Sequence, residues 1–276
     1  MFKETNVESW TEFSVKVAEL QRKVSSDSRW NRRLLFRGHE KSDWQLKTTL
    51  ERYGQEGMRF REYYRTISSL RPLIEMLTQK QWEIPGYMEI ARKADEIDDL
   101  DFQLSVQNSD IFQYMAYLRH NGFPSPLLDW TRSLYVASYF AFRSVPGDIL
   151  NGNVSICVLL EANMQSGGSG IPSIRTIGPY MKTHRRHFLQ QSDYTMCLMY
   201  NGSERFFARH EVALQVEKLD EFPENFEIHK FNIPITERLT ALKMLDEHNL
   251  NAYSLFGSEE SLMETLAMRE FSLKNM

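Results

Sequence analysis

Leu34-Leu35-Phe36-Arg37-Gly38-His39 is the stretch of sequence that decides both the fold and the site. Three apolar residues flanked by charge predict a short buried strand that ends at Arg37-Gly38. An arginine fixed at a strand end can hold a phosphate or a carboxylate, and the glycine lets a ligand approach the backbone beside His39. The alternative is an arginine that pairs with a carboxylate for structural reasons. Taken alone, these six residues favour that alternative.

Regular apolar patterns on both sides of this strand predict a mixed fold. Apolar residues at three- and four-residue steps predict helices over 10–24, 60–77, 111–118, 132–141, 239–245 and from Ser258 onward. Further strands are predicted over 154–160, 196–199, 212–216 and 226–233. The order lacks regular βαβ alternation, which indicates an α+β fold with a mixed or mainly antiparallel central sheet and flanking helices.

Composition limits the function classes. A formal net charge of -4 argues against a general polyanion binder, because such a surface usually leaves the whole domain basic. Two cysteines, Cys157 and Cys197, lie inside apolar runs and are typical of buried residues in a reducing compartment. The start of the chain does not resemble a secretory leader, and its apolar runs are too short to cross a bilayer. We therefore expect a cytoplasmic protein without a membrane partner.

Standard motifs are not found. The seven histidines do not fall at metal-ligand spacing, so we expect no metal site. The glycine-rich segment 165–170 lacks the spacing and strand context of a phosphate-binding loop, and a flexible loop is predicted there.

A second unusual segment is Leu127-Leu128-Asp129-Trp130-Thr131-Arg132-Ser133. A tryptophan beside small polar side chains, before an aromatic helix, can form a pocket wall with hydrogen-bonding groups. The alternative is a helix cap by Asp129 or Thr131 with Trp130 in the core. The two interpretations are compatible, because a cap can also face a site.

A third segment runs from Arg186 to Thr195 and is followed by Arg209-His210-Glu211. It gathers hydrogen-bonding side chains next to apolar strands; these include Gln190, Gln191, Tyr194, His210 and Glu211. Composition alone favours a surface loop here.

Taken in order, these segments resemble the FRG-domain family of bacterial and phage-associated proteins. The resemblance rests on Leu35–Gly38, Leu118–Pro124, Leu127–Thr131, Arg186 with Gln190–Thr195, and Asn249–Phe256. It implies a single FRG domain over residues 30–268, with a helical extension at 1–29 and a tail at 269–276. The family name implies a fold more firmly than an activity.

The chain is also distantly similar to ADP-ribosyltransferases of the Arg-Ser-Glu type, which implies a transferase-like fold and NAD as substrate. Arg37 matches the arginine that ends the first strand, and Thr131 resembles the position before the Ala/Phe-rich helix. Glu211 is one candidate for the catalytic glutamate; alternatively, Gln190 or Gln191 replaces it.

The similarity implies further roles around NAD. Arg37, with Gly38 and His39, would hold a phosphate or ribose, and Asp129 and Thr131 would brace the pocket. Trp130 or Tyr194 would stack on nicotinamide, with His210 beside the glutamate. A glutamate stabilises the positive charge that develops as nicotinamide leaves, whereas a glutamine brings no charge.

Three hypotheses follow. The first is an NAD-consuming ADP-ribosyltransferase or glycohydrolase, a toxin or antiphage effector with a protein or nucleic-acid acceptor and an antitoxin or defence-system partner. The second is a noncatalytic module that binds a nucleotide, nucleic acid or phage component. The third is an adaptor in which Arg37 pairs with Asp129 or Glu211. A carboxylate beside Arg37 and Thr131 would favour catalysis, and a glutamine there would favour binding.

Overall fold

The computed structural model describes residues 2–31, 33–96, 110–144, 152–162, 170–178, 185–202, 204–215 and 226–274. The predicted glycine-rich loop at 165–170 lies outside these ranges apart from Gly170. Within them no helix is both long enough and apolar enough to cross a membrane.

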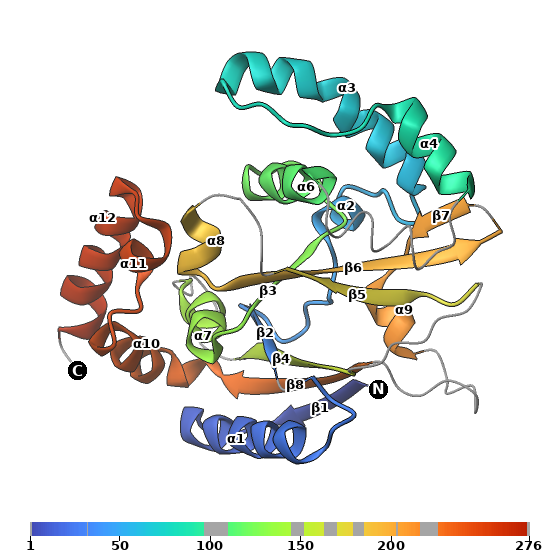
Figure 1. Ribbon diagram of the computed structural model, residues 1–276. Coiled ribbons are helices and arrows are strands. Elements are labelled where there is room, and N and C mark those ends of the chain that lie inside the picture. The colour runs from blue at the N-terminus through green and yellow to red at the C-terminus, as the bar shows by residue number, and fades with distance from the viewer. Residues whose placement is uncertain are drawn as a thin grey trace.

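The centre of the molecule is an eight-stranded sheet (Figure 1). Its strands are β1 (Phe2–Asn6), β2 (Leu35–His39), β3 (Leu128–Thr131), β4 (Asn153–Glu161), β5 (Ser173–Ile177), β6 (Ser192–Asn201), β7 (Glu204–Phe207) and β8 (Phe226–Pro234). The order is β1-β8-β4-β2-β3-β6-β5, and β7 pairs with β6. Only the β1–β8 pair is parallel among the described strand pairs. The predicted α+β class with a mixed, mainly antiparallel sheet is confirmed.

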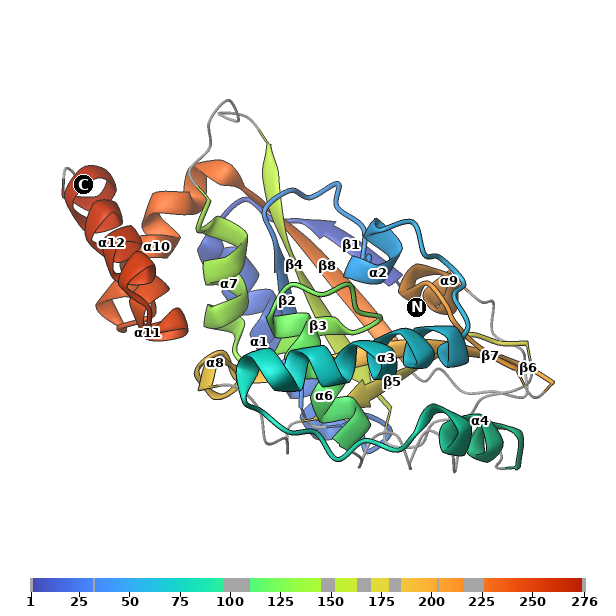
Figure 2. The same cartoon turned by 90° about the horizontal axis from the view of Figure 1, so that it is seen from above.

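Helices cover the sheet on several sides. They are α1 (Trp10–Ser26), α2 (Thr49–Arg52), α3 (Phe60–Thr78), α4 (Tyr87–Glu96), α6 (Asp110–His120), α7 (Leu134–Phe142), α8 (Arg185–Leu189), α9 (His210–Gln215), α10 (Arg238–Glu247), α11 (Ala252–Phe256) and α12 (Glu259–Met268). Two short turns follow β8 and α12, η1 (Ile235–Glu237) and η2 (Arg269–Leu273). Figure 2 shows α10, α11 and α12 gathered on one side of the molecule, next to α7.

Most predicted elements are present, and the predicted strand over 212–216 is wrong. Residues 210–215 form α9, with Glu211 in its first turn. The alternation of Val212, Leu214 and Val216 suggested a strand, yet Val212 is exposed and Leu214 is buried. Alanine, leucine, glutamine and glutamate are all good helix formers, and one buried leucine is enough to anchor so short a helix.

The N-terminal segment contributes more than the predicted helix. Residues 2–6 form β1, which adds a parallel edge strand to β8. Lys3 of β1 and Lys23 of α1 both pair with the buried carboxylate of Glu227 in β8. The segment 1–29 is therefore joined to the sheet by backbone and side-chain contacts.

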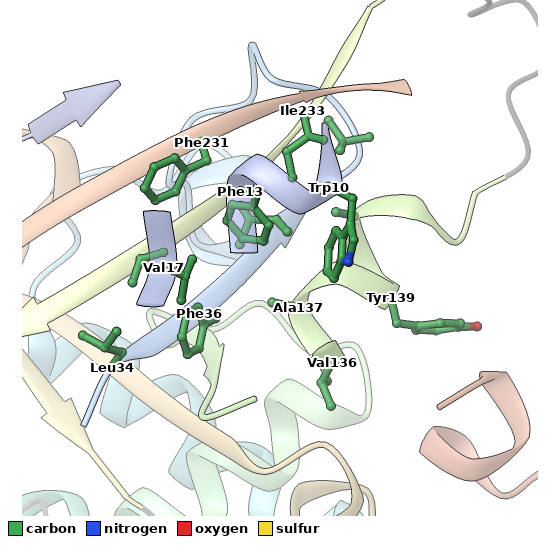
Figure 3. Packing of buried hydrophobic residues seen from close by; sticks show 14 of the residues in the cluster. Trp10, Phe13, Val17, Leu34, Phe36, Val136, Ala137, Tyr139, Phe231 and Ile233 are labelled. Atoms are coloured by element: carbon green, nitrogen blue, oxygen red, sulfur yellow. The ribbon is translucent and has the colours of Figure 1, made fainter. Parts of the chain in front are cut away.

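The largest apolar core lies where α1 and α7 meet the sheet (Figure 3). Phe13 of α1, Phe36 of β2 and Phe231 of β8 are at most 3% exposed. The ring of Phe13 contacts that of Phe231 edge-on, with centroids 5.4 Å apart. This core fixes β2 in the middle of the sheet, and β2 carries Arg37.

Close packing between β2 and α7 depends on Gly38. A Cβ atom on Gly38 would lie 2.0 Å from the carbonyl oxygen of Ala137 and 2.7 Å from the backbone nitrogen of Ala141. No side chain fits in that space, so glycine here allows a helix to approach the strand. The sequence interpretation expected a ligand to make this approach, and the structure places α7 there.

Candidate functional site

A pocket of about 280 Å³ opens where β2 and β3 separate. The two strands pair only through Phe36 and Thr131, although β2 pairs with β4 along its full length. Helices α6, α7, α8 and α11 supply the other walls. The lining residues are Phe36, Arg37, Gly38, Arg119, His120, Asp129, Trp130, Thr131, Ala137, Phe140, Arg186, Gln190, Ser192 and Phe256.

Arg37 lies in the gap between the two strands. Its Nη1 donates to the backbone oxygen of Asp129 at 2.6 Å, and its Nε donates to Nε2 of His39 at 3.0 Å. Burial lowers the pKa of Arg37 to about 10, against the opposing effect of the Asp129 carboxylate, so it stays charged at neutral pH. Two of five N–H groups are used in these bonds, which leaves others for a ligand.

Three arginines surround one carboxylate at this end of the pocket. Arg119 of α6 donates to Oδ2 of Asp129 at 2.5 Å. Arg37 and Arg52, the last residue of α2, also interact electrostatically with Asp129. Positive charge therefore exceeds negative charge, an arrangement suited to an anionic ligand.

Another part of the pocket wall is aromatic. Phe140 of α7 meets Phe256 of α11 edge-on, with ring centroids 5.9 Å apart. The guanidinium of Arg186 lies 5.6 Å from the centre of the Phe256 ring, and that of Arg143 lies 4.9 Å from it. Such rings bordered by cations can hold the planar part of a ligand.

Thr131 and Gln190 connect the pocket to its surroundings. The Thr131 hydroxyl donates to the backbone oxygen of Gln190 at 2.7 Å and accepts from the backbone nitrogen of Ser133 at 3.1 Å. Ser133 is the residue that caps α7, so the predicted cap by Asp129 or Thr131 is wrong. The Gln190 side chain donates to the backbone oxygen of Leu255 at 3.3 Å and so ties α11 to the site.

Residues 32–147 match the model of the FRG domain. The predicted resemblance to the FRG-domain family is therefore confirmed over this range. Neither the curated proteins nor the solved structures include a match to the chain. The match begins before β2 and ends beyond α7, and it covers the first part of the predicted 30–268 region.

The FRG match supplies most of the pocket lining, including Phe140 of the aromatic wall, and residues beyond it supply the rest. Arg37, Arg119, Asp129 and Thr131 fall inside the match. Gln190 and Phe256 lie far downstream in the chain, in the turn between α8 and β6 and at the end of α11. A complete pocket lining therefore requires residues from the C-terminal half of the chain.

Glu211 and His210 do not line this pocket. Glu211 lies in the first turn of α9, where Oε1 accepts from the backbone nitrogen of Leu46 at 3.2 Å and Oε2 pairs with Arg209 at 3.2 Å. His210 is buried against Thr195, whose hydroxyl lies 2.8 Å from Nε2. Burial lowers the pKa of His210 to about 3, so it is neutral. Of the predicted alternatives for the third position, the structure brings Gln190 to the pocket.

Other predicted site residues take supporting positions. Trp130 borders the pocket, and its indole N–H donates to Thr195 at 2.8 Å. His39 is buried beneath Arg37, and burial lowers its pKa to about 3, so it accepts from Arg37 as a neutral ring.

Tyr194 is fully buried and cannot stack on a ligand. Gln191 adopts a left-handed backbone conformation, with φ 48°, at the turn before β6.

Sequence reasoning missed several residues that line the pocket. Arg119, His120, Phe140, Arg186, Ser192 and Phe256 lie within or beside segments that carried the family resemblance, yet no role was predicted for them. Arg119-His120 at the end of a helix was the available signal. Its meaning depends on the fold, which brings that helix end beside β3.

The described residues contain no group of three or more His, Cys, Asp or Glu side chains arranged to hold a metal ion. The predicted pocket residues instead provide guanidinium groups, amides and aromatic rings. Chemically, such a set can bind anions and planar groups.

Proposed function

We propose that this pocket binds a nucleotide or a closely related aromatic phosphate, and that it binds this ligand without cleaving it. The observation that carries the proposal is the excess of arginine around Asp129, next to the Phe140–Phe256 wall. Arginine pairs with phosphate through two parallel N–H groups, and aromatic rings stack with bases. A nucleotide offers both groups in one molecule.

The identity of the residue beside Thr131 supports binding over catalysis. Departure of nicotinamide from NAD creates positive charge on the ribose, which a carboxylate would stabilise. Gln190 stands in the pocket with Arg37 and Thr131 and brings no charge. Asp129 is a carboxylate, but Arg119 pairs with it at 2.5 Å and two other arginines lie near it. Its negative charge is already compensated.

Pocket size supports a ligand group of mononucleotide scale inside the walls. A volume of about 280 Å³ lies at the lower end of pockets that hold small molecules. A phosphate and part of a nucleoside would be enclosed, and the remainder of a larger ligand such as NAD would extend from the mouth.

Transfer of ADP-ribose from NAD is the second candidate function. It is favoured by one observation, the meeting of Arg37 and Thr131 in one pocket, as the distant similarity implied. On this candidate the protein is a toxin or antiphage effector that modifies a protein or nucleic acid, with an antitoxin or defence-system partner. A sensor of nucleotides would serve the same defence role through binding.

Incubation with NAD separates the two candidates. Released nicotinamide is followed by chromatography, while thermal unfolding is recorded with phosphate, AMP, ADP-ribose and NAD. We expect AMP and ADP-ribose to raise the melting temperature, because a ligand that binds only the folded state stabilises it. NAD should remain intact. Nicotinamide release that disappears in Arg37→Gln would establish the enzymatic candidate instead.

A matched control is available for the binding measurement. Arg65 is an exposed arginine of α3 outside the pocket lining, so Arg65→Gln removes the same charge elsewhere. We expect ligand stabilisation to persist in Arg65→Gln and to be lost in Arg37→Gln. Equal loss in both variants would show that binding depends on overall charge and would contradict a specific pocket.

A further inference from the structure

Three aromatic side chains form a chain of contacts from the pocket into the core. His120, at the end of α6, lines the pocket, whereas Tyr194 of β6 and His187 of α8 are at most 1% exposed. The Tyr194 hydroxyl oxygen lies 2.5 Å from Nε2 of His120 and 3.2 Å from Nδ1 of His187. The His187 ring stacks on Tyr194, and the His120 ring meets it edge-on.

The number of hydrogens restricts how these contacts are made. Burial raises the pKa of Tyr194 above its usual value, so the phenol keeps its proton at neutral pH. A phenol has one hydrogen and can donate it to only one acceptor. At least one of the two imidazole nitrogens must therefore carry its own hydrogen and donate to the phenol oxygen.

The two distances differ in a way that favours one arrangement of the donors. Hydroxyl donors form shorter hydrogen bonds than N–H donors, with lower limits of about 2.5 Å and about 2.7 Å respectively. The short contact to His120 fits a bond in which the Tyr194 hydroxyl donates to Nε2. The longer contact fits an N–H of His187 that donates to the phenol oxygen.

We propose that Tyr194 is a positioning residue of the pocket, which holds His120 as a neutral imidazole with its hydrogen on Nδ1. His187 completes this chain of hydrogen bonds by donating to the Tyr194 hydroxyl. His120 can gain a proton at Nε2 only if Tyr194 turns its hydrogen away from it. The positive charge of the pocket then comes from arginine alone.

Charged groups around His120 act in the same direction. Arg119 precedes it on α6, Arg37 of β2 and Arg186 of α8 line the same pocket, and Asp129 of β3 is engaged by Arg119. Next to Tyr194 in β6, the Ser192 side chain hydrogen-bonds to the phenol and lowers the pKa of Tyr194, whereas the charge of Asp193 raises it. Among the described residues that line the pocket, a cationic His120 would face more positive than negative charge, which disfavours protonation.

Nitrogen NMR of the histidine rings tests the assignment directly in the unliganded wild-type protein. Long-range proton–nitrogen spectra distinguish the two neutral tautomers from the imidazolium ion, and His120→Gln and His187→Gln assign the signals. We expect wild-type His120 to carry its hydrogen on Nδ1 at neutral pH. In Tyr194→Phe we expect His120 to populate more than one tautomer or protonation state. A wild-type His120 that carries its hydrogen on Nε2, or is cationic at neutral pH, would overturn the proposal.

The consequence for ligand binding rests on the proposed function and is measured separately. ADP-ribose keeps the charge of its diphosphate between about pH 5 and pH 8, the range in which an ordinary histidine titrates. We expect the wild-type affinity for ADP-ribose to stay level over this range. In Tyr194→Phe, the affinity should rise several-fold towards low pH, because His120 can then become cationic. An affinity for ADP-ribose that does not change with pH in either protein would contradict the positioning role of Tyr194.

The two measurements fail independently. If ADP-ribose does not bind the wild type, the proposed function fails while the His120 tautomer can still be determined. If ADP-ribose binds and changes the NMR signals of only the exposed His248, His120 is not part of the binding site. If ADP-ribose shifts the NMR signals of His120 but the unliganded ring is already cationic, the binding pocket is supported and the proposed role of Tyr194 is contradicted.

Discussion

At the residue scale, Arg37 combines a structural and a ligand-facing position. It supports β3 through the backbone oxygen of Asp129 and rests on neutral His39 below. The adaptor hypothesis predicted a direct pair between Arg37 and a carboxylate. Its hydrogen bonds instead go to a backbone carbonyl and an imidazole, and Oδ2 of Asp129 accepts from Arg119. The guanidinium therefore keeps capacity for an anion.

Gln190→Glu tests the charge of the pocket. A carboxylate introduced beside Thr131 would repel a phosphate and reduce the excess of positive charge. We expect the affinity for AMP to fall at least about tenfold, which corresponds to about 1.4 kcal/mol of binding free energy. Gln191→Glu, at the exposed neighbouring position, is the control and should change the affinity little. Tighter binding by Gln190→Glu would argue against an anionic ligand.

Asp193 is expected to make stability depend on pH. Its side chain is fully buried, 3.7 Å from Arg132 and 3.8 Å from Arg33, and burial raises its pKa from 3.8 to about 6. Neither carboxylate oxygen accepts a hydrogen bond from the part of the chain that the structure describes. Between pH 4 and pH 6 the folded protein binds more protons than the unfolded chain, so stability falls as pH rises through this window.

Comparison with Asp193→Asn isolates this effect. The free energy of unfolding of the wild type, relative to Asp193→Asn, should fall by about 3 kcal/mol between about pH 4 and about pH 7. Urea denaturation at several pH values measures it. A difference that does not change with pH would mean that Asp193 ionises normally.

At the element scale, the contact between β2 and α7 shapes the pocket. Gly38→Ala would place a methyl group against the backbone of Ala137 and Ala141. Backbone cannot yield as a flexible side chain can, so we expect at least about 1–3 kcal/mol of destabilisation, measured by urea denaturation. Gly86→Ala is the control, because a Cβ there meets no atom within 4 Å. Equal stability of both variants would contradict the packing of α7.

Sequence patterns identified elements whose own residues decide their structure. The long helices α1 and α3 and the central strands β4 and β8 have apolar patterns that indicate both their type and their burial. Strands β1, β5 and β7 were not predicted, because each is short and depends on pairing with a partner far along the chain. Helix α9 was misassigned for a related reason, since six residues carry little periodic signal.

The candidate site could be predicted only in part for the same reason. Arg37, Asp129, Thr131 and Gln190 were found because they belong to recognisable segments, and the fold brings them together. Glu211 was an equally reasonable choice in the sequence. Its exclusion depends on α9, which places it against Leu46. Arg119 and Phe256 also belong to such segments, but the helix ends that carry them indicate a site only once tertiary structure brings them to the pocket.

At the scale of the whole molecule, the matched FRG region is not a separate folding unit. Its strand β2 pairs with β4, and its strand β3 pairs with β6, both outside residues 32–147. The fragment 32–147 would expose unpaired strand edges and lose the core formed with α1 and β8. We expect it to lack cooperative unfolding in circular dichroism, whereas 1–276 unfolds cooperatively. A cooperatively folded fragment would contradict this architecture.

The most direct test of the anion-binding pocket is calorimetric titration of ADP-ribose into the wild type, Arg37→Gln and Arg65→Gln. Loss of one charge-assisted contact costs about 1.5–3 kcal/mol, so we predict at least about tenfold weaker binding by Arg37→Gln. Arg65→Gln should bind like the wild type. A folded Arg37→Gln variant that bound ADP-ribose as tightly as the wild type would contradict anion binding by Arg37.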